Sequence, residues 1–216
     1  PRFSLSWANS AMVFSGDESI RSRPSEPLLD ALRQLGVEAY TTRKHSDAAP
    51  FVVRGPLRSG RVQVSGLTSQ WTSSLLVAVP LCQGTTRIDL PEPRETPYIE
   101  MTLDWMRKSG IEFLYDQEGY TWYEIPGGQK YQAFERDIPS DWSTVAFPLV
   151  AALGTGSRIT IENLDFNDKQ GDRKIVDYLL AMDADIVRDE QAGSLTVTGG
   201  RTLKGAELDL LETPDA

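Results

Sequence analysis

The chain has 216 residues, 40% of them hydrophobic, so it can bury a core in one large domain or two modest ones, and a disordered chain is excluded. Its formal net charge of -9 disfavours a broad surface for nucleic acid, although a local basic pocket can still bind one small anion. The single cysteine, Cys82, excludes an internal disulfide framework and a cysteine metal cluster, and it suits a reducing compartment.

The predicted elements begin with a strand at 12–16 and an amphipathic helix at 24–35, whose leucines recur at helical spacing. Two strands follow this helix, and the second ends near Gly55. The next helix, expected at 69–81, is of a different kind because it is apolar almost all round. That pattern predicts a helix buried inside a domain rather than one lying over its surface.

The same series recurs further along the chain. A strand at 87–91 precedes an amphipathic helix at 97–109 and two more strands, the second of which ends near Gly127. Another helix that is apolar almost all round is expected at 142–153, and Pro148 should kink it or begin its regular part.

A third copy has a strand at 160–164, an amphipathic helix at 172–182 and two strands, the second ending near Gly199. The copies follow one another at intervals of about 74 residues, and such self-similarity restricts the fold more than local propensity does. We therefore predict an α/β (α+β) fold of repeated sheet-and-helix units, in which the apolar helices are enclosed by sheets.

A domain boundary is expected after Pro139, where a strand-like segment ends. The next residues, 140–143 (SDWS), form a suitable cap for the helix that follows. Residues 1–139 then form part of one domain, and residues 140–216 begin a second.

The chain carries no pattern typical of a membrane span or a secretory leader, so we expect a cytoplasmic protein without membrane contact. It begins at Pro1 rather than Met, and its last residues follow a strand-like run without a closing element. We therefore also expect a fragment of a longer protein.

Thr68, Ser69 and Gln70 offer two hydroxyls and an amide directly before a helix, where free N–H groups and the helix dipole favour an anion. An ordinary helix cap has the same pattern. Arg23 precedes Pro24 at the entrance to a helix, where its guanidinium can hold a carboxylate or phosphate or remain solvated.

Five motifs in this chain occur in the order and approximate spacing of one known family. They are 15–24 (SGDESIRSRP), 66–70 (GLTSQ), 96–99 (TPYI), 140–143 (SDWS) and 214–216 (PDA). From Val13 onward the chain resembles the 5-enolpyruvylshikimate-3-phosphate synthase family of enolpyruvyl transferases, whereas residues 1–11 fit that family poorly.

The resemblance implies two domains of three similar units each, which close over the substrates. It also implies that the enolpyruvyl group of phosphoenolpyruvate is transferred to the 5-hydroxyl of 3-phosphoshikimate, with release of phosphate, in the shikimate pathway to chorismate and the aromatic amino acids. Neither a metal nor another cofactor is implied. The chain would supply only part of the active site and would be inactive alone, with residues 1–139 on the side that holds the substrate phosphate.

The resemblance also implies roles for single residues. The hydroxyls of Thr68 and Ser69 would hold the 3-phosphate, and Gln70 and Tyr98 would contact the shikimate ring. Arg23 would bind phosphoenolpyruvate, and Asp215 would accept the proton of the reacting hydroxyl as the catalytic residue.

Glu95 departs from the family pattern, which commonly has serine three residues before the tyrosine matched by Tyr98, where it helps to bind the 3-phosphate. A carboxylate and a phosphate repel each other when both are desolvated. Either phosphate binding differs here, or Glu95 turns away.

Three alternatives stay open. A cell-wall enolpyruvyl transferase acting on UDP-N-acetylglucosamine has the same architecture but uses a cysteine on a mobile loop, whereas Cys82 is expected on a buried helix. A non-catalytic member retained for binding or assembly is kept open by Glu95. An RNA 3'-phosphate cyclase is remote because the chain is acidic and lacks an aromatic and basic strip.

Overall fold

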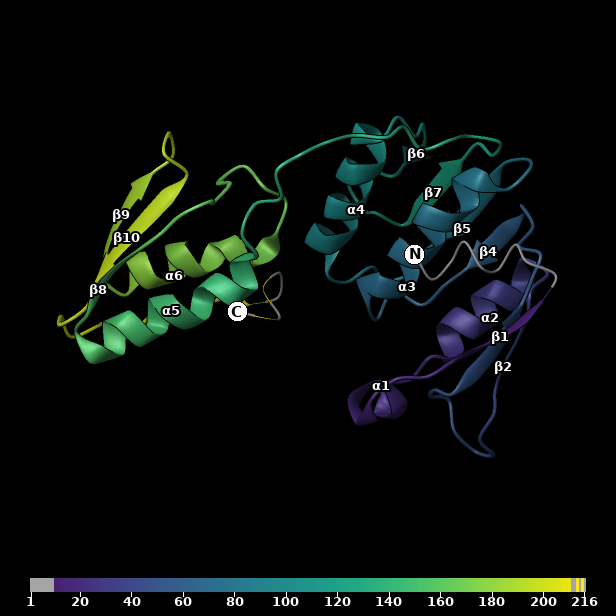
Figure 1. Ribbon diagram of the computed structural model, residues 1–216, viewed down its shortest axis with the longest axis horizontal. Helices are drawn as coiled ribbons and strands as arrows, with labels where there is room; N and C mark the ends of the chain where they lie inside the picture. The colour runs from purple at the N-terminus through teal and green to yellow at the C-terminus, as the bar shows by residue number, and fades with distance from the viewer. Residues whose placement is uncertain (1–9, 211–212, 214, 216) are drawn as a thin grey trace. The chain divides into compact units, whose positions relative to one another are not determined.

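The computed structural model describes residues 10–210, 213 and 215 (Figure 1). It divides into two compact units, Pro1–Ala133 and Phe134–Ala216. The boundary expected after Pro139 lies in the same extended stretch, because residues 129–141 form neither helix nor strand. Each unit is described by itself.

The three-copy repeat is confirmed by the order of strands in the sheets. Each copy runs strand, helix, strand, strand, and in each sheet the third strand of the copy lies between the first and the second. The pairings within each copy are antiparallel. The three sheets are β1-β3-β2, β4-β5-β7-β6 and β8-β10-β9, so the middle sheet has one additional strand, β4.

The first copy and the short helix α1 (Glu18–Ser22) open unit 1. The strands are β1 (Ala11–Phe14), β2 (Glu38–Thr41) and β3 (Phe51–Arg54). The amphipathic helix predicted for this copy is α2 (Glu26–Gln34), which packs on β2 and also reaches β4 of the next sheet. Its leucines Leu29 and Leu32 are buried, as the helical spacing predicts.

The second copy completes unit 1. Its elements are β5 (Thr86–Asp89), α4 (Thr96–Lys108), β6 (Leu114–Tyr115) and β7 (Trp122–Ile125), preceded by β4 (Arg61–Gln63), α3 (Ser69–Ala78) and the 3-10 helix η2 (Val79–Leu81). The strands β4 and β5 pair in parallel, so the chain needs a crossover between them, and α3 with η2 provides it.

The helix α3 is an interior helix, as its apolar composition predicts. Leu75 and Leu76, with Val79 of η2 directly after the helix, are fully buried, and they belong to one core that also contains residues of α2, of α4 and of both sheets of unit 1. Val77 is the exception, since it is 44% exposed. One continuous core therefore holds α3 and α4 in fixed positions.

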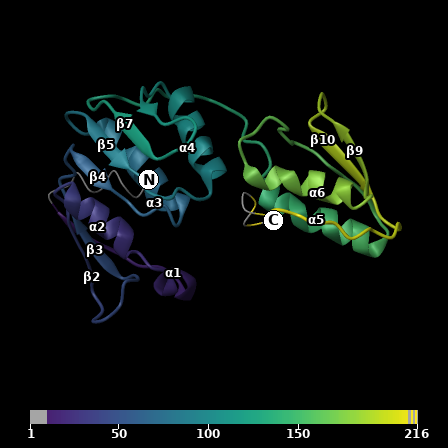
Figure 2. The same ribbon diagram turned by 180° about the vertical axis from the view of Figure 1, so that it is seen from behind.

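The third copy forms unit 2. Its elements are β8 (Arg158–Ile161), α6 (Ile175–Ala181), β9 (Asp185–Asp189) and β10 (Ser194–Thr198). The helix α5 (Trp142–Thr155) precedes the copy, and the 3-10 helix η3 (Gly171–Lys174) leads into α6. The helices α5 and α6 lie side by side against the sheet (Figures 1 and 2). Trp142 and Leu149 of α5 pack there against Val176 and Leu195.

The enclosure predicted for α5 is met on one side of the helix only. Phe147 is 75% exposed and Val150 is 54% exposed, because unit 2 has a single three-stranded sheet and that sheet covers one face of the helix. Pro148 lies inside α5, so the regular helix begins at Trp142 and not at the proline. In the described part of the chain, no helix combines the length and the apolar character needed to cross a membrane.

Asp141 caps α5, as the sequence of residues 140–143 predicts. Its carboxylate accepts hydrogen bonds from the Ser143 N–H (3.2 Å) and from the Thr144 hydroxyl (2.6 Å). We expect Asp141→Ala to lower the free energy of unfolding of unit 2 by about 1 kcal/mol at neutral pH, measured by urea denaturation. Asp141→Asn is the control, because asparagine caps nearly as well.

The effect of Asp141→Ala should depend on pH. The hydrogen bonds, above all the one from Thr144, hold the pKa of Asp141 below its usual value. A carboxylate whose pKa falls on folding stabilises the folded state above its unfolded pKa of about 3.9, and this contribution is lost as the pH falls through the folded value. The difference between wild type and Asp141→Ala should therefore shrink below about pH 4, and a constant difference would contradict this account.

Candidate functional site

The helices α3 and α4 lie side by side and run in the same direction. At their beginnings the Glu95 side chain contacts Ser69, and one turn further along both helices the hydroxyls of Ser73 and Thr102 lie 2.8 Å apart. The positive ends of two helix dipoles therefore meet at one place in unit 1. Such a place favours a negatively charged group.

Thr68 and Ser69 present hydrogen-bond donors at the start of α3. Thr68 is the N-cap, with an extended backbone, and its Oγ1 accepts a hydrogen bond from the Gln70 N–H at 3.5 Å. Ser69 is 5% exposed, whereas Gln70, in the first turn, is exposed. The two neighbouring hydroxyls and the N–H groups of this turn, which have no partner within the helix, are the donors that an anion would use.

Glu95 fills this place with its own carboxylate. Its Oε2 accepts hydrogen bonds from the Ser69 N–H (2.9 Å), the Ser69 hydroxyl (2.9 Å) and the Thr68 hydroxyl (3.3 Å). In this structure the Glu95 side chain is not turned away from the donors, because its carboxylate points at them. The attraction of a carboxylate for a helix N-terminus with unsatisfied N–H groups explains this orientation.

The loop that carries Glu95 approaches α3 through a glycine. The Arg94 N–H donates to the Gly66 carbonyl (3.1 Å), and a Cβ on Gly66 would meet the Glu92 carbonyl oxygen at 2.4 Å. A side chain at position 66 would thus push the two backbone segments apart. The close approach at Gly66 brings residues 91–95 near enough for Glu95 to reach Ser69.

Tyr98 lies in the first turn of α4, next to Glu95. Its N–H donates to the Glu95 carbonyl (3.0 Å), its own carbonyl accepts from Thr102 Oγ1 (3.0 Å), and its side chain is half-buried. The structure thus brings Tyr98 to the same pair of helix ends as Thr68 and Ser69.

Arg23 and Asp215 belong to neither α3 nor α4. Arg23 follows α1 and is exposed, and the structure describes no hydrogen bond or ion pair between it and Thr68, Ser69 or Gln70. Asp215 belongs to unit 2 and is exposed, while its neighbours Pro214 and Ala216 lie outside the described residues. Their expected roles stay predictions.

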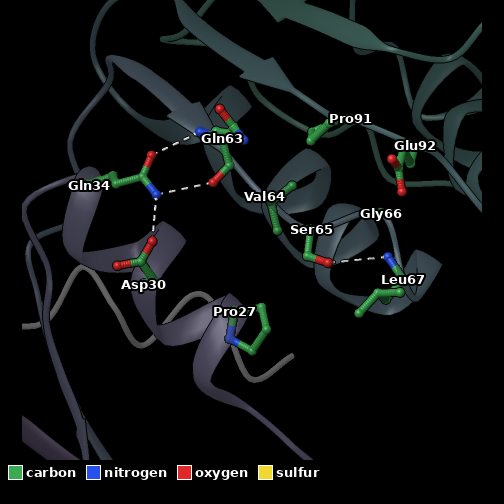
Figure 3. Close-up of a pocket in the computed structure, with 10 residues that line it drawn as sticks. All are labelled: Pro27, Asp30, Gln34, Gln63, Val64, Ser65, Gly66, Leu67, Pro91 and Glu92. Atoms are coloured by element: carbon green, nitrogen blue, oxygen red, sulfur yellow. Dashed lines mark hydrogen bonds between the residues drawn. The ribbon is translucent and has the colours of Figure 1, made fainter.

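An open pocket of about 620 Å³ lies beside the loop that precedes α3 (Figure 3). Gln34 of α2 reaches across it to β4, where its side-chain NH2 donates to the Gln63 carbonyl (3.1 Å) and its side-chain oxygen accepts from the Gln63 N–H (2.9 Å). Asp30 and Glu92 also line the pocket and make it acidic, so it does not suit an anionic ligand. No local pattern marks Gln34, because its partner Gln63 is 29 residues away along the chain.

Cys82 is buried and lies directly after η2, with its Sγ 3.6 Å from the Leu57 carbonyl. Burial raises the pKa of the Cys82 thiol and so disfavours the reactive thiolate. Within the described residues, no group of three or more His, Cys, Asp or Glu side chains could hold a metal ion.

The sequence matches a family model described as EPSP synthase (3-phosphoshikimate 1-carboxyvinyltransferase) over residues 2–216. The matched range includes residues 2–11, for which a poor fit was expected. The 3-phosphoshikimate 1-carboxyvinyltransferase of Methanothrix thermoacetophila is 44% identical over 205 residues, which make up 94% of this chain and 47% of that protein. The protein of the same name from Ruminiclostridium cellulolyticum is 38% identical over 204 residues, 94% of this chain and 47% of that protein.

Among solved structures, EPSP synthase from Acinetobacter baumannii is similar with a TM-score of 0.71 and 26% identity, over 98% of this chain and 49% of that one. This likeness identifies the fold as that of the enolpyruvyl transferases, as the sequence analysis expects. The chain spans about half the length of the curated relatives it matches.

The close approach at Gly66 can be tested by substitution. We expect Gly66→Ala to lower the free energy of unfolding of unit 1 by about 1–3 kcal/mol, because the added Cβ collides with backbone atoms that cannot rotate away. Gly60→Ala in the same unit is the matched control, since its Cβ would meet only Leu35 at an ordinary 3.7 Å. Equal effects in urea denaturation would show that the approach at Gly66 is not tight.

Proposed function

The chain belongs to the EPSP synthase family, and we propose that the protein of which it forms part transfers the enolpyruvyl group of phosphoenolpyruvate to the 5-hydroxyl of 3-phosphoshikimate. The hydroxyl oxygen attacks the middle carbon of phosphoenolpyruvate, whose methylene carbon takes up a proton. The tetrahedral intermediate then loses inorganic phosphate and a proton, which restores the double bond. The reaction needs proton transfer and cationic groups that hold both substrates.

One observation in unit 1 carries this proposal. Three donors, the Ser69 N–H and the hydroxyls of Ser69 and Thr68, lie within 3.3 Å of a single anionic oxygen, Oε2 of Glu95. That carboxylate oxygen stands in for an oxygen of the 3-phosphate. Donors that already converge on one anion are pre-organised for another at the same place.

The shikimate ring would then lie over the first turns of the two helices. Gln70 is exposed there and offers both an amide donor and an acceptor to ring hydroxyls. Tyr98 lies in the first turn of α4, whose N-cap residue Glu95 contacts Ser69. The 3-phosphate held by Thr68 and Ser69 fixes the distance at which these two side chains meet the ring.

We assign the remaining roles by family resemblance. Arg23 would bind phosphoenolpyruvate through its guanidinium, and Asp215 would accept the proton of the 5-hydroxyl. Residues 1–139 would belong to the domain that holds the substrate phosphate, and residues 140–216 would begin the second domain. The cytoplasmic location expected from the sequence also stays a prediction.

A second candidate, binding without turnover, is favoured by the same Glu95 carboxylate, because it fills donors that the substrate phosphate requires. The UDP-N-acetylglucosamine transferase alternative is disfavoured, because Cys82 is buried and its thiol pKa is raised. Turnover by the full-length protein separates the first two candidates.

The 216-residue chain alone should be nearly inactive. Relatives are about twice as long, so groups outside this chain would complete the active site. Removing one pre-organised donor costs roughly 3–4 kcal/mol of transition-state stabilisation, so removing several should lower kcat by far more than about a thousandfold. Phosphate release should be measured for this chain and for the full-length protein. Comparable turnover by the short chain would refute the claim that it is incomplete.

Two substitutions in the full-length protein test the assigned residues. Asp215→Ala should lower kcat about 10²–10⁴-fold, because a general base is lost. Gln70→Ala should raise KM for 3-phosphoshikimate about fivefold, as the loss of roughly one hydrogen bond implies. Asp137→Ala, at another exposed aspartate of unit 2, is the control for Asp215→Ala. A full-length enzyme indifferent to both substitutions would remove the proposed site.

A further inference from the structure

Glu95 is the N-cap residue of α4, but its side chain does not cap that helix. The Glu95 side chain makes no cap hydrogen bond to α4. Its carboxylate instead accepts hydrogen bonds from Ser69 at the N-terminus of the neighbouring helix α3. The backbone of Glu95 has a φ of 53°, in the left-handed region that residues other than glycine and asparagine seldom adopt. The contacts with Thr68 and Ser69 therefore accompany an uncommon local conformation.

The carboxylate and a bound phosphate cannot share these donors. The Ser69 N–H and the Ser69 hydroxyl each have one proton to donate, and both are engaged by Oε2 of Glu95. Ser69 is 5% exposed, so little water is available to screen two neighbouring anions. A phosphate can reach all three donors only after the Glu95 side chain has left them.

We propose that Glu95 is an internal competitor of the substrate phosphate: it occupies the phosphate donors in the ligand-free protein and sets the affinity for the phosphorylated substrate. This inference rests on the proposed function. The carboxylate makes a self-inhibitory contact that satisfies the buried donors until a ligand with a stronger anion displaces it. The affinity for 3-phosphoshikimate is therefore lower than the donors alone would give.

The charge of Glu95 can be removed with little change in shape. Glu95→Gln keeps a side-chain oxygen that accepts from Ser69, so the loop keeps its partner, but a neutral acceptor binds about half as strongly as a carboxylate. Glu92→Gln is the matched control. Glu92 lies three residues earlier in the same loop, also at positive φ (52°), and is exposed, so its substitution removes the same charge without touching the donors.

The experiment is calorimetric titration of the full-length protein with 3-phosphoshikimate and with shikimate, which lacks the phosphate. We expect Glu95→Gln to bind 3-phosphoshikimate about tenfold more tightly than wild type does, as the loss of one charged hydrogen-bond partner implies. Shikimate should bind both forms alike, and Glu92→Gln should match wild type within about twofold. Glu95→Ser repeats the test with a side chain too short to place an oxygen where Oε2 of Glu95 lies. Thermal unfolding verifies that this variant is folded.

Two results would overturn the inference in different ways. If Glu95→Gln and Glu95→Ser bind 3-phosphoshikimate no better than wild type, while Ser69→Ala binds it more weakly, the phosphate site stands and Glu95 is not its competitor. If no form binds 3-phosphoshikimate and Ser69→Ala changes nothing, the proposed function itself fails and takes this inference with it.

Discussion

The parallel packing of α3 against α4 is the constraint on which the candidate site depends. Two helix beginnings can meet only if the loop before each one approaches the other, and that approach occurs where Gly66 lies against the backbone of residues 91 and 92. The positive ends of the two helix dipoles then lie close together, and a nearby negative charge stabilises this arrangement even without a ligand. Glu95 satisfies it, so the properties of the site follow from how two helices are packed.

Most of the fold could be predicted because its determinants are local. Apolar residues at helical spacing mark one face of α2, α4 and α6, and the recurrence of strand, helix, strand, strand predicts three similar units. The strand order that these units share in their sheets was found in the structure. The environment of α5 could not be predicted in this way. Composition shows that Phe147 and Val150 are apolar, but only the number of elements around the helix decides whether they are covered.

Part of the candidate site could be located from the sequence, where a short pattern marks a helix cap. Thr68 and Ser69 form a cap sequence that can be recognised from the neighbouring residues alone, whereas their contact with a substrate phosphate stays a prediction from family resemblance. The orientation of Glu95 was not predictable, because its partner Ser69 is 26 residues away and the connecting geometry depends on a left-handed backbone. Arg23 was proposed as a binding residue from its position before a helix and from family resemblance. Its position in the sequence alone does not determine which groups its side chain contacts.

Gln34 lines the pocket and also bonds the backbone of Gln63 in β4 (Figure 3). The strand β4 is the outermost strand of its sheet, and Gln63 turns its N–H and carbonyl outward, since the next residue, Val64, bonds inward to Asp89. The side-chain amide of Gln34 forms hydrogen bonds with both groups, as the backbone of a neighbouring strand would. Unpaired edge strands invite other chains to add to the sheet and begin aggregates. A single helix side chain thus shields the backbone groups of Gln63 from intermolecular pairing, without another strand having to be built.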